Sequence, residues 1–177
     1  MLRPDKLRAC MREVSSVIAA ALEPFGFDPA PSIIVSDLLV RRWRRYSGWR
    51  TDALDVCHHR DLAANVHVDL RVFLPCPEGT ETWLDGVAVA VLLGHEPSYR
   101  LAPRLGRARR GHCAGLGRAI AADAAQALPW FDRFASPAAC LELLRLGETS
   151  WGRARSAVTA ELATYLESLR EEQPGNM

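Results

Sequence analysis

The chain of 177 residues is about one domain long, and its hydrophobic share of 49% and charged share of 24% are ordinary for a globular protein. No apolar run approaches the roughly 18–20 residues of a membrane span, and residues 1–6 hold no apolar signal region, so we expect a cytoplasmic protein without membrane contact. The net charge of only +1 disfavours a dedicated nucleic-acid protein, because binding to the phosphate backbone relies on a positive surface.

An amphipathic helix is predicted over residues 5–23. Its apolar residues recur at helical spacing as Leu7, Met11, Val14, Ile18 and Leu22. Pro24 and Gly26 end the helix, and we expect Phe25 and Phe27 to pack its exit against the core.

A strand is predicted over residues 33–46, with a polar interruption at Ser36 and Asp37. It runs into a basic segment, residues 41–50, which holds five arginines and three aromatic residues. Arginine beside stacking aromatics is typical of single-stranded nucleic-acid binding. It is equally typical of a strand whose arginine stems cover apolar neighbours and whose tryptophans anchor the sheet. We favour this structural interpretation and keep nucleic-acid binding as the alternative.

The clearest pattern is a strict alternation over residues 65–74, which predicts a strand with one buried face. The residues expected to face the helices are Val66, Val68, Leu70, Val72 and Leu74. Residues 53–59 alternate in the same way, and the link between the two runs is about as long as a hairpin loop. We therefore expect an antiparallel hairpin of 53–59 with 65–74.

Polar residues occupy the other face of this hairpin. They are Asp55, Cys57, His59, His67, Asp69 and Arg71. Residues of these types can bind zinc, but their spacing matches no standard zinc pattern and the arginine would lie close to any cation. We therefore expect a half-solvated face with cross-strand polar pairs, and no metal or other cofactor.

The second half of the chain turns from strand to helix. The apolar residues within 83–93 do not alternate, which favours a strand covered on both faces. A loop is predicted over 94–110, with a short strand at 99–101. Helices are predicted over 112–128, 137–146 and 153–172, with Ser136 and Gly147 as caps of the middle one.

These elements predict an α+β fold, in which an antiparallel sheet of three to five strands packs against an N-terminal helix and three C-terminal helices. We expect a single domain over residues 1–177, with a core at about 5–146 and a C-terminal helical extension at about 149–172.

Five cysteines are spread along the chain without a C-x-x-C pair. They are Cys10, Cys57, Cys76, Cys113 and Cys140. An odd number at wide spacing favours reduced and mostly buried thiols, which suits a reducing compartment.

Charge is segregated along the sequence. Residues 61–99 hold six acidic residues and one basic residue, and residues 100–118 hold six basic residues and no acidic one. The acidic segment would suit a basic protein partner, with contacts expected at Asp61, Glu78, Glu81, Asp85 and Glu96. The basic segment precedes a predicted helix start, where an anion could bind to Arg104, Arg107, Arg109 and Arg110.

The order of motifs over residues 10–145 resembles a bacterial family known only as a domain of unknown function, number 4304. The likeness rests on the Gly26-Phe27 step after the opening helix, the alternating strand at 66–70, the arginine-rich loop before a helix, and the ending at 127–131. The tryptophan pair typical of that family's later loop is not evident in this chain. The resemblance implies a fold and no activity, but small α+β families of this kind often serve as antitoxins or immunity proteins.

No catalytic motif stands out: a G-x-S-x-G elbow, a P-loop and a G-x-G-x-x-G fingerprint are all missing from the sequence. We therefore expect a non-catalytic protein-binding module, most simply an immunity protein that neutralises a bacterial toxin. The alternatives are an enzyme or binder that takes an anionic or phosphorylated ligand through the arginine-rich loop, and a nucleic-acid-binding protein.

Overall fold

The computed structural model describes residues 4–35, 38–59, 65–75, 81–94, 99–100, 111–149 and 157–172. The chain divides into two compact units. The first unit comprises Met1–Arg45, Ala53–Leu70 and Val87–Leu128, and the second comprises Tyr46–Asp52, Arg71–Gly86 and Pro129–Met177.

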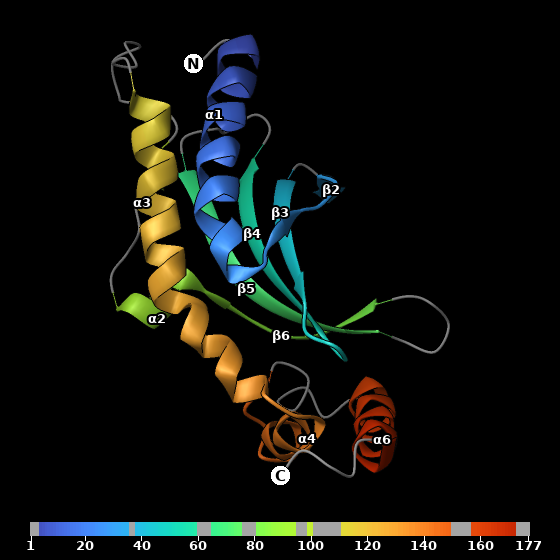
Figure 1. Cartoon of the computed structure of the whole chain (residues 1–177). Coiled ribbons are helices and arrows are strands. Elements are labelled where there is room, and N and C mark those ends of the chain that lie inside the picture. The colour runs from blue at the N-terminus through green and yellow to red at the C-terminus, as the bar shows by residue number, and fades with distance from the viewer. Residues whose placement is uncertain are drawn as a thin grey trace. The chain divides into compact units, whose positions relative to one another are not determined.

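The fold is α+β, as predicted, with a seven-stranded sheet in the order β1-β3-β4-β5-β6 (Figure 1); β2 pairs with β3, and β7 pairs with β5. The strands are β1 (Asp28–Pro29), β2 (Ile33–Val35), β3 (Leu38–Tyr46), β4 (Thr51–His59), β5 (Asn65–Pro75), β6 (Glu81–Ala88) and β7 (Tyr99–Arg100). The helices are α1 (Pro4–Leu22), α2 (Val89–Leu93), α3 (His112–Ala127), α4 (Pro137–Arg145) and α6 (Ala157–Glu172), with 3-10 turns η1 (Glu23–Phe25) and η2 (Leu128–Phe134). Within the described ranges, no helix is both long enough and apolar enough to span a membrane.

In the first unit, α1 and α3 run side by side (Figure 1). The apolar stripe of α1 is buried, as its periodicity predicts, through Met11, Val14, Ile18 and Leu22. The two helices approach closely at Gly117 of α3, because a Cβ atom there would lie 2.9 Å from Cβ of Val17 and 3.1 Å from the carbonyl oxygen of Val14.

The alternating residues of β5 are buried, which confirms the prediction for this strand. They are Val66, Val68, Leu70, Val72 and Leu74. On β4, however, the expectation of a half-solvated face is wrong, because residues 51–58 are buried on both faces of the strand. One reason is that the long side chain of Arg42 reaches from β3 and pairs with Asp55, which shields this carboxylate from solvent.

Three other details differ from the sequence prediction. The strand expected over 33–46 is two antiparallel strands, with Val35 opposite Leu38, since Ser and Asp favour chain reversal over continuation. Residues 89–93 are helical, because a short apolar run without alternation fits a helix as well as a strand. Phe25 is exposed, whereas Phe27 is buried as expected, because the turn η1 directs only the latter into the core.

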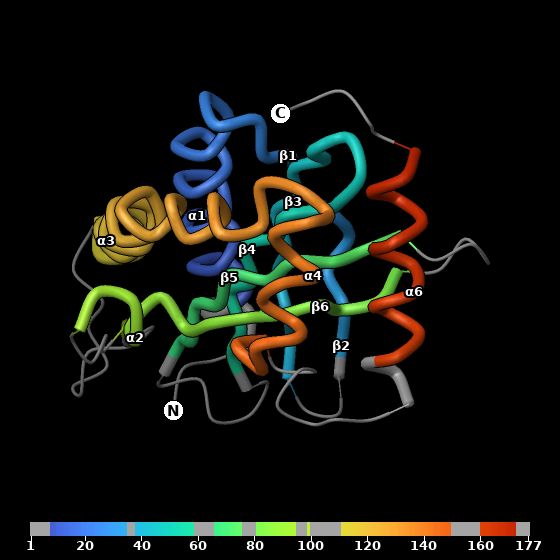
Figure 2. The backbone as a smooth tube through the Cα atoms, turned by 90° about the horizontal axis from the view of Figure 1, so that it is seen from below, coloured from blue at the N-terminus to red at the C-terminus, as the bar shows by residue number. Residues whose placement is uncertain are grey.

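In the second unit, α4 and α6 lie side by side (Figure 2). Ser136 caps α4 as predicted, and its side-chain oxygen accepts a hydrogen bond from the backbone of Ala139 at 3.1 Å. Gly147 ends the helix with φ of 73°, and the backbone of Glu148 donates to the carbonyl of Leu143 at 2.9 Å. This pairing is the Schellman arrangement that a glycine at this position favours.

Candidate protein-binding edge

One edge of the sheet is formed by β1 and β2, which both pair with β3. Pro29 lies opposite Trp43, and Ile33 lies opposite Val40. The edge therefore advances four residues, from 29 to 33, while β3 advances only three, from 43 to 40. The extra residue marks a β-bulge, a device common at sheet edges.

The two halves of this edge differ in how they are protected. Pro29 and Pro31 lie at or beside β1 and cannot donate a backbone hydrogen bond to an incoming strand. The β2 half contains no proline and carries Ile33 and Ile34, which are 40% and 57% exposed. Because neighbouring residues of a strand point to opposite faces, apolar surface is open on both sides of β2.

A further exposed aromatic residue lies near the other end of the same edge. Phe25, at the end of η1, is 43% exposed, and its carbonyl oxygen accepts a hydrogen bond from Nη1 of Arg45 at 3.4 Å. Arg45 also stacks over the ring of Phe27 at 4.8 Å from the ring centroid. The edge therefore carries apolar side chains at both ends, with arginines on the adjacent strand.

Within the basic segment 41–50, Arg42 and both tryptophans support the fold. Arg42 donates two hydrogen bonds to the carboxylate of Asp55, at 2.6 and 2.7 Å. Trp43 and Trp49 are buried, so their ring faces are not open to stack on a nucleobase. These positions support the structural interpretation of the segment.

Arg50, at the end of the segment, belongs to a buried polar cluster in the second unit. Its Nε atom lies 2.7 Å from the carboxylate of Asp52, and its Nη2 atom donates to the carbonyl oxygen of Phe131 at 3.2 Å. Cys140 of α4 lies near this pair, and burial is the main cause that raises the pKa of its thiol to about 12. A thiol with this pKa is almost fully protonated at neutral pH and is a poor nucleophile.

The acidic contacts predicted from the sequence fall into different environments. Glu81 is exposed at the start of β6 and accepts a hydrogen bond from Thr51 at 3.1 Å. Asp85, on the same strand, is only 4% exposed and offers little surface to a partner. The remaining predicted contacts, Asp61, Glu78 and Glu96, lie outside the described residues. The predicted anion site, formed by Arg104, Arg107, Arg109 and Arg110, also lies there.

The polar hairpin face does not gather a set of metal ligands in the described part of the chain, where no three His, Cys, Asp or Glu side chains are placed to hold a metal ion. Cys57 is buried, whereas His67 is exposed to solvent. The side chain of His59 lies outside the description.

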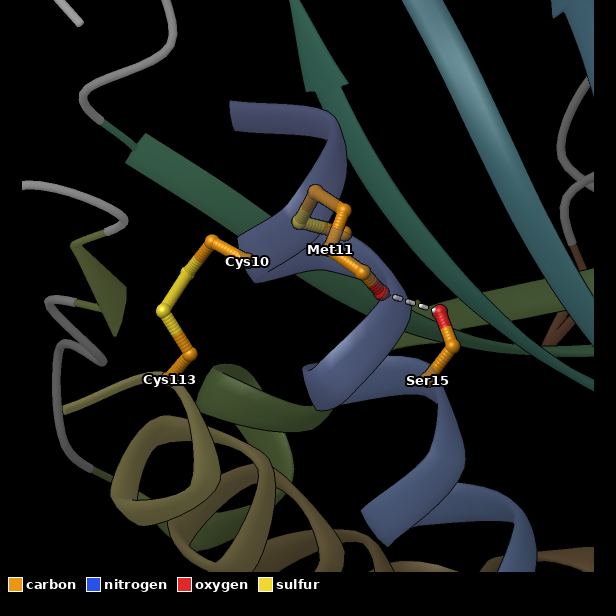
Figure 3. The surroundings of a disulfide bond; sticks show 4 residues. All are labelled: Cys10, Met11, Ser15 and Cys113. Carbon is orange, nitrogen blue, oxygen red and sulfur yellow. Dashed lines mark hydrogen bonds between the residues drawn. A yellow bond between two sulfur atoms is a disulfide. The ribbon is translucent and has the colours of Figure 1, made fainter. Parts of the chain in front are cut away.

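The prediction that all cysteines are reduced is wrong for two of them. Cys10 of α1 and Cys113 of α3 form a disulfide across 103 residues of sequence, with their Cα atoms 5.3 Å apart (Figure 3). Only the packing of the two helices brings them together, so spacing along the sequence carried no signal. Cys57 and Cys140 form no disulfide and are buried, as expected, and Cys76 lies outside the described residues.

The exposed edge at β2 was not singled out from the sequence. An Ile-Ile-Val run is typical of a buried strand, and only its position at the edge of the sheet leaves it open. Comparison of the chain with protein-family models, with curated proteins and with solved structures gave no match. The resemblance to family 4304 therefore stays a prediction.

Proposed function

We propose that this chain is a non-catalytic protein-binding module, and specifically an immunity protein that receives an extended segment of a bacterial toxin at β2. The observation that carries the proposal is the open edge at Ile33 and Ile34, which are exposed on opposite faces of a short strand. Strand addition at such an edge provides backbone hydrogen bonds, and alternate side chains provide specificity.

The charge beside the edge suggests the composition of the toxin segment. Strand β3, which pairs with β1 and β2, carries four arginines, of which Arg42 is paired with Asp55. The other three are Arg41, Arg44 and Arg45. A segment with alternating apolar and acidic residues would pair with the isoleucines and approach a positive surface, which speeds association and rejects basic competitors.

The buried polar groups support a structural role in place of a catalytic one. Asp52 and Asp55 are each paired with an arginine, and the thiol of Cys140 is held protonated by burial. Groups engaged in this way stabilise a scaffold, and a scaffold with a complementary edge is all that an inhibitor needs.

Co-expression with the product of a neighbouring toxin-like reading frame tests the proposal. Wild type should protect the host cell, and Ile34→Lys should weaken toxin binding at least about tenfold, because lysine on an edge strand opposes strand addition. The matched control is Val91→Lys on α2, since Val91 is also exposed and apolar in the first unit but lies outside the edge.

Four results would count against the proposal. Equal loss of binding in both lysine variants would show a general effect of added charge or lost folding. Loss on Glu81→Lys alone would move the contact to the acidic segment. Lack of protection or binding by the wild type would overturn the immunity function, and a dimer in solution that Ile34→Lys dissociates would assign the edge to a second copy of the chain.

A further inference from the structure

Among the residues that the structure describes, Arg41 of β3 has no carboxylate partner, in contrast to its neighbour Arg42. The Nε atom of Arg41 is buried and meets no hydrogen-bond acceptor among them, whereas the guanidinium of Arg42 donates two hydrogen bonds to Asp55. Within the described part of the chain, Arg41 makes neither a hydrogen bond nor an ion pair. A buried charged donor without an acceptor is costly, so this arginine calls for a partner.

A second cation, Arg12 of α1, lies within electrostatic range of Arg41. Arg12 is exposed on α1 and, among the described residues, is also without an ion pair. Burial and, after it, the positive charge of Arg12 lower the pKa of Arg41. An arginine side chain stays protonated in proteins, so loss of a proton cannot relieve the repulsion between the two guanidinium groups. A bound anion can.

Another unsatisfied donor lies on the same face of β3. Trp43 is two residues beyond Arg41, and residues at this spacing share a face of the strand. The indole ring is buried, and its Nε1 atom has no hydrogen-bond acceptor in the described ranges of the chain. The guanidinium groups of Arg12 and Arg41 and the indole N–H of Trp43 thus belong to the region where α1 lies against the sheet in the first unit (Figure 1).

We propose that Arg12 and Arg41 form an oxyanion-binding site that takes a phosphate or carboxylate group between α1 and β3. The planar guanidinium fork matches the geometry of both groups, which it binds through paired hydrogen bonds. Arg12 is exposed and would bind the anion on its solvent side, whereas Arg41 is half-buried and would bind the anion on its protein side. This site is separate in sequence from the arginine-rich segment 100–110 and does not depend on the proposed toxin partner.

Thermal unfolding with added anions tests the site. Inorganic phosphate, or acetate in a parallel series, replaces chloride at constant ionic strength, so that general screening of charge stays the same. A ligand at ten times its dissociation constant should raise Tm of the wild type by about 3–6 °C. The anion that gives the larger shift identifies the preferred group.

The decisive variant is Arg12→Glu, which places a carboxylate of the chain itself beside Arg41. We expect this variant to have a higher Tm than wild type in chloride and to lose the response to phosphate and acetate. Arg41→Ala should also lose the response. The control is Arg118→Ala, because Arg118 is exposed on α3 in the same unit and should leave the response unchanged.

Phosphate also stabilises proteins by exclusion from their surface, and the variants separate this effect from binding. An equal rise in Tm for wild type, Arg12→Glu and Arg41→Ala would overturn the proposal, as would the absence of any rise in the wild type. A lower Tm for Arg12→Glu in chloride, with the response to phosphate retained, would show that the two arginines do not share a ligand.

Discussion

Two helix pairs, one in each unit, are held together by different kinds of contact. In the first unit, α1 and α3 share a disulfide, Cys10 to Cys113, and a close backbone approach at Gly117. In the second unit, α4 and α6 bury leucines on both helices and share an exposed ion pair, Arg145 with Glu167, at 2.7 Å.

The difference shows how strongly each pair depends on particular residues. Buried leucines tolerate other apolar residues of similar volume, whereas a disulfide and a glycine contact have no substitute of the same shape. We therefore expect the contact of α1 with α3 to respond sharply to single changes at its interface. The exposed ion pair between α4 and α6 should respond weakly.

The largest expected effect comes from removing the disulfide. Cys113→Ser should lower the free energy of unfolding by about 2–5 kcal/mol, because the bond closes a loop of about 100 residues and restricts the unfolded chain. Urea unfolding of both proteins, with and without a reductant, measures this change in the free energy of unfolding. The reductant should destabilise the wild type and leave Cys113→Ser unchanged; a wild type that is insensitive to reductant would show that the bond does not form.

A smaller effect is expected at the close approach of the helices. Gly117→Ala should lower the free energy of unfolding by about 1–2 kcal/mol, because overpacking against Val17 outweighs the gain in helix propensity. Gly115→Ala is the matched control in the same helix, since its nearest neighbour is the flexible end of Arg118 at 3.9 Å. This control should be more stable than wild type by up to about 1 kcal/mol, and a similar gain in Gly117→Ala would contradict the close approach.

The smallest effect should follow loss of the ion pair between α4 and α6. The side chains of Arg145 and Glu167 are 62% and 43% exposed, and solvent screens such a pair strongly. Arg145→Ala should therefore change the free energy of unfolding by less than about 1 kcal/mol, and by less still in high salt. Denaturation of both proteins at low and high salt measures the difference; a loss of several kcal/mol would show that the two helices rely on this pair.

The sequence alone determined those helices and strands whose periodicity and capping residues lie within a single segment. The helical repeat of α1, the alternation of β5, and the Ser136 and Gly147 caps of α4 each specify their structure through neighbouring residues. These signals were sufficient for the α+β class, because helix and strand periods depend on backbone geometry alone.

The candidate sites were decided by contacts between distant segments. The hydrophobic run at 33–35 is identical in pattern to a core strand, and only its place beyond β3 in the sheet leaves Ile33 and Ile34 open. Likewise, Arg41 and Arg42 are neighbours of the same type, yet Arg42 forms an ion pair with Asp55, whereas Arg41 lies within electrostatic range of Arg12. Alternation along β3 turns them to opposite faces, so the partner of each charge is set by what packs there, which no spacing along the chain records.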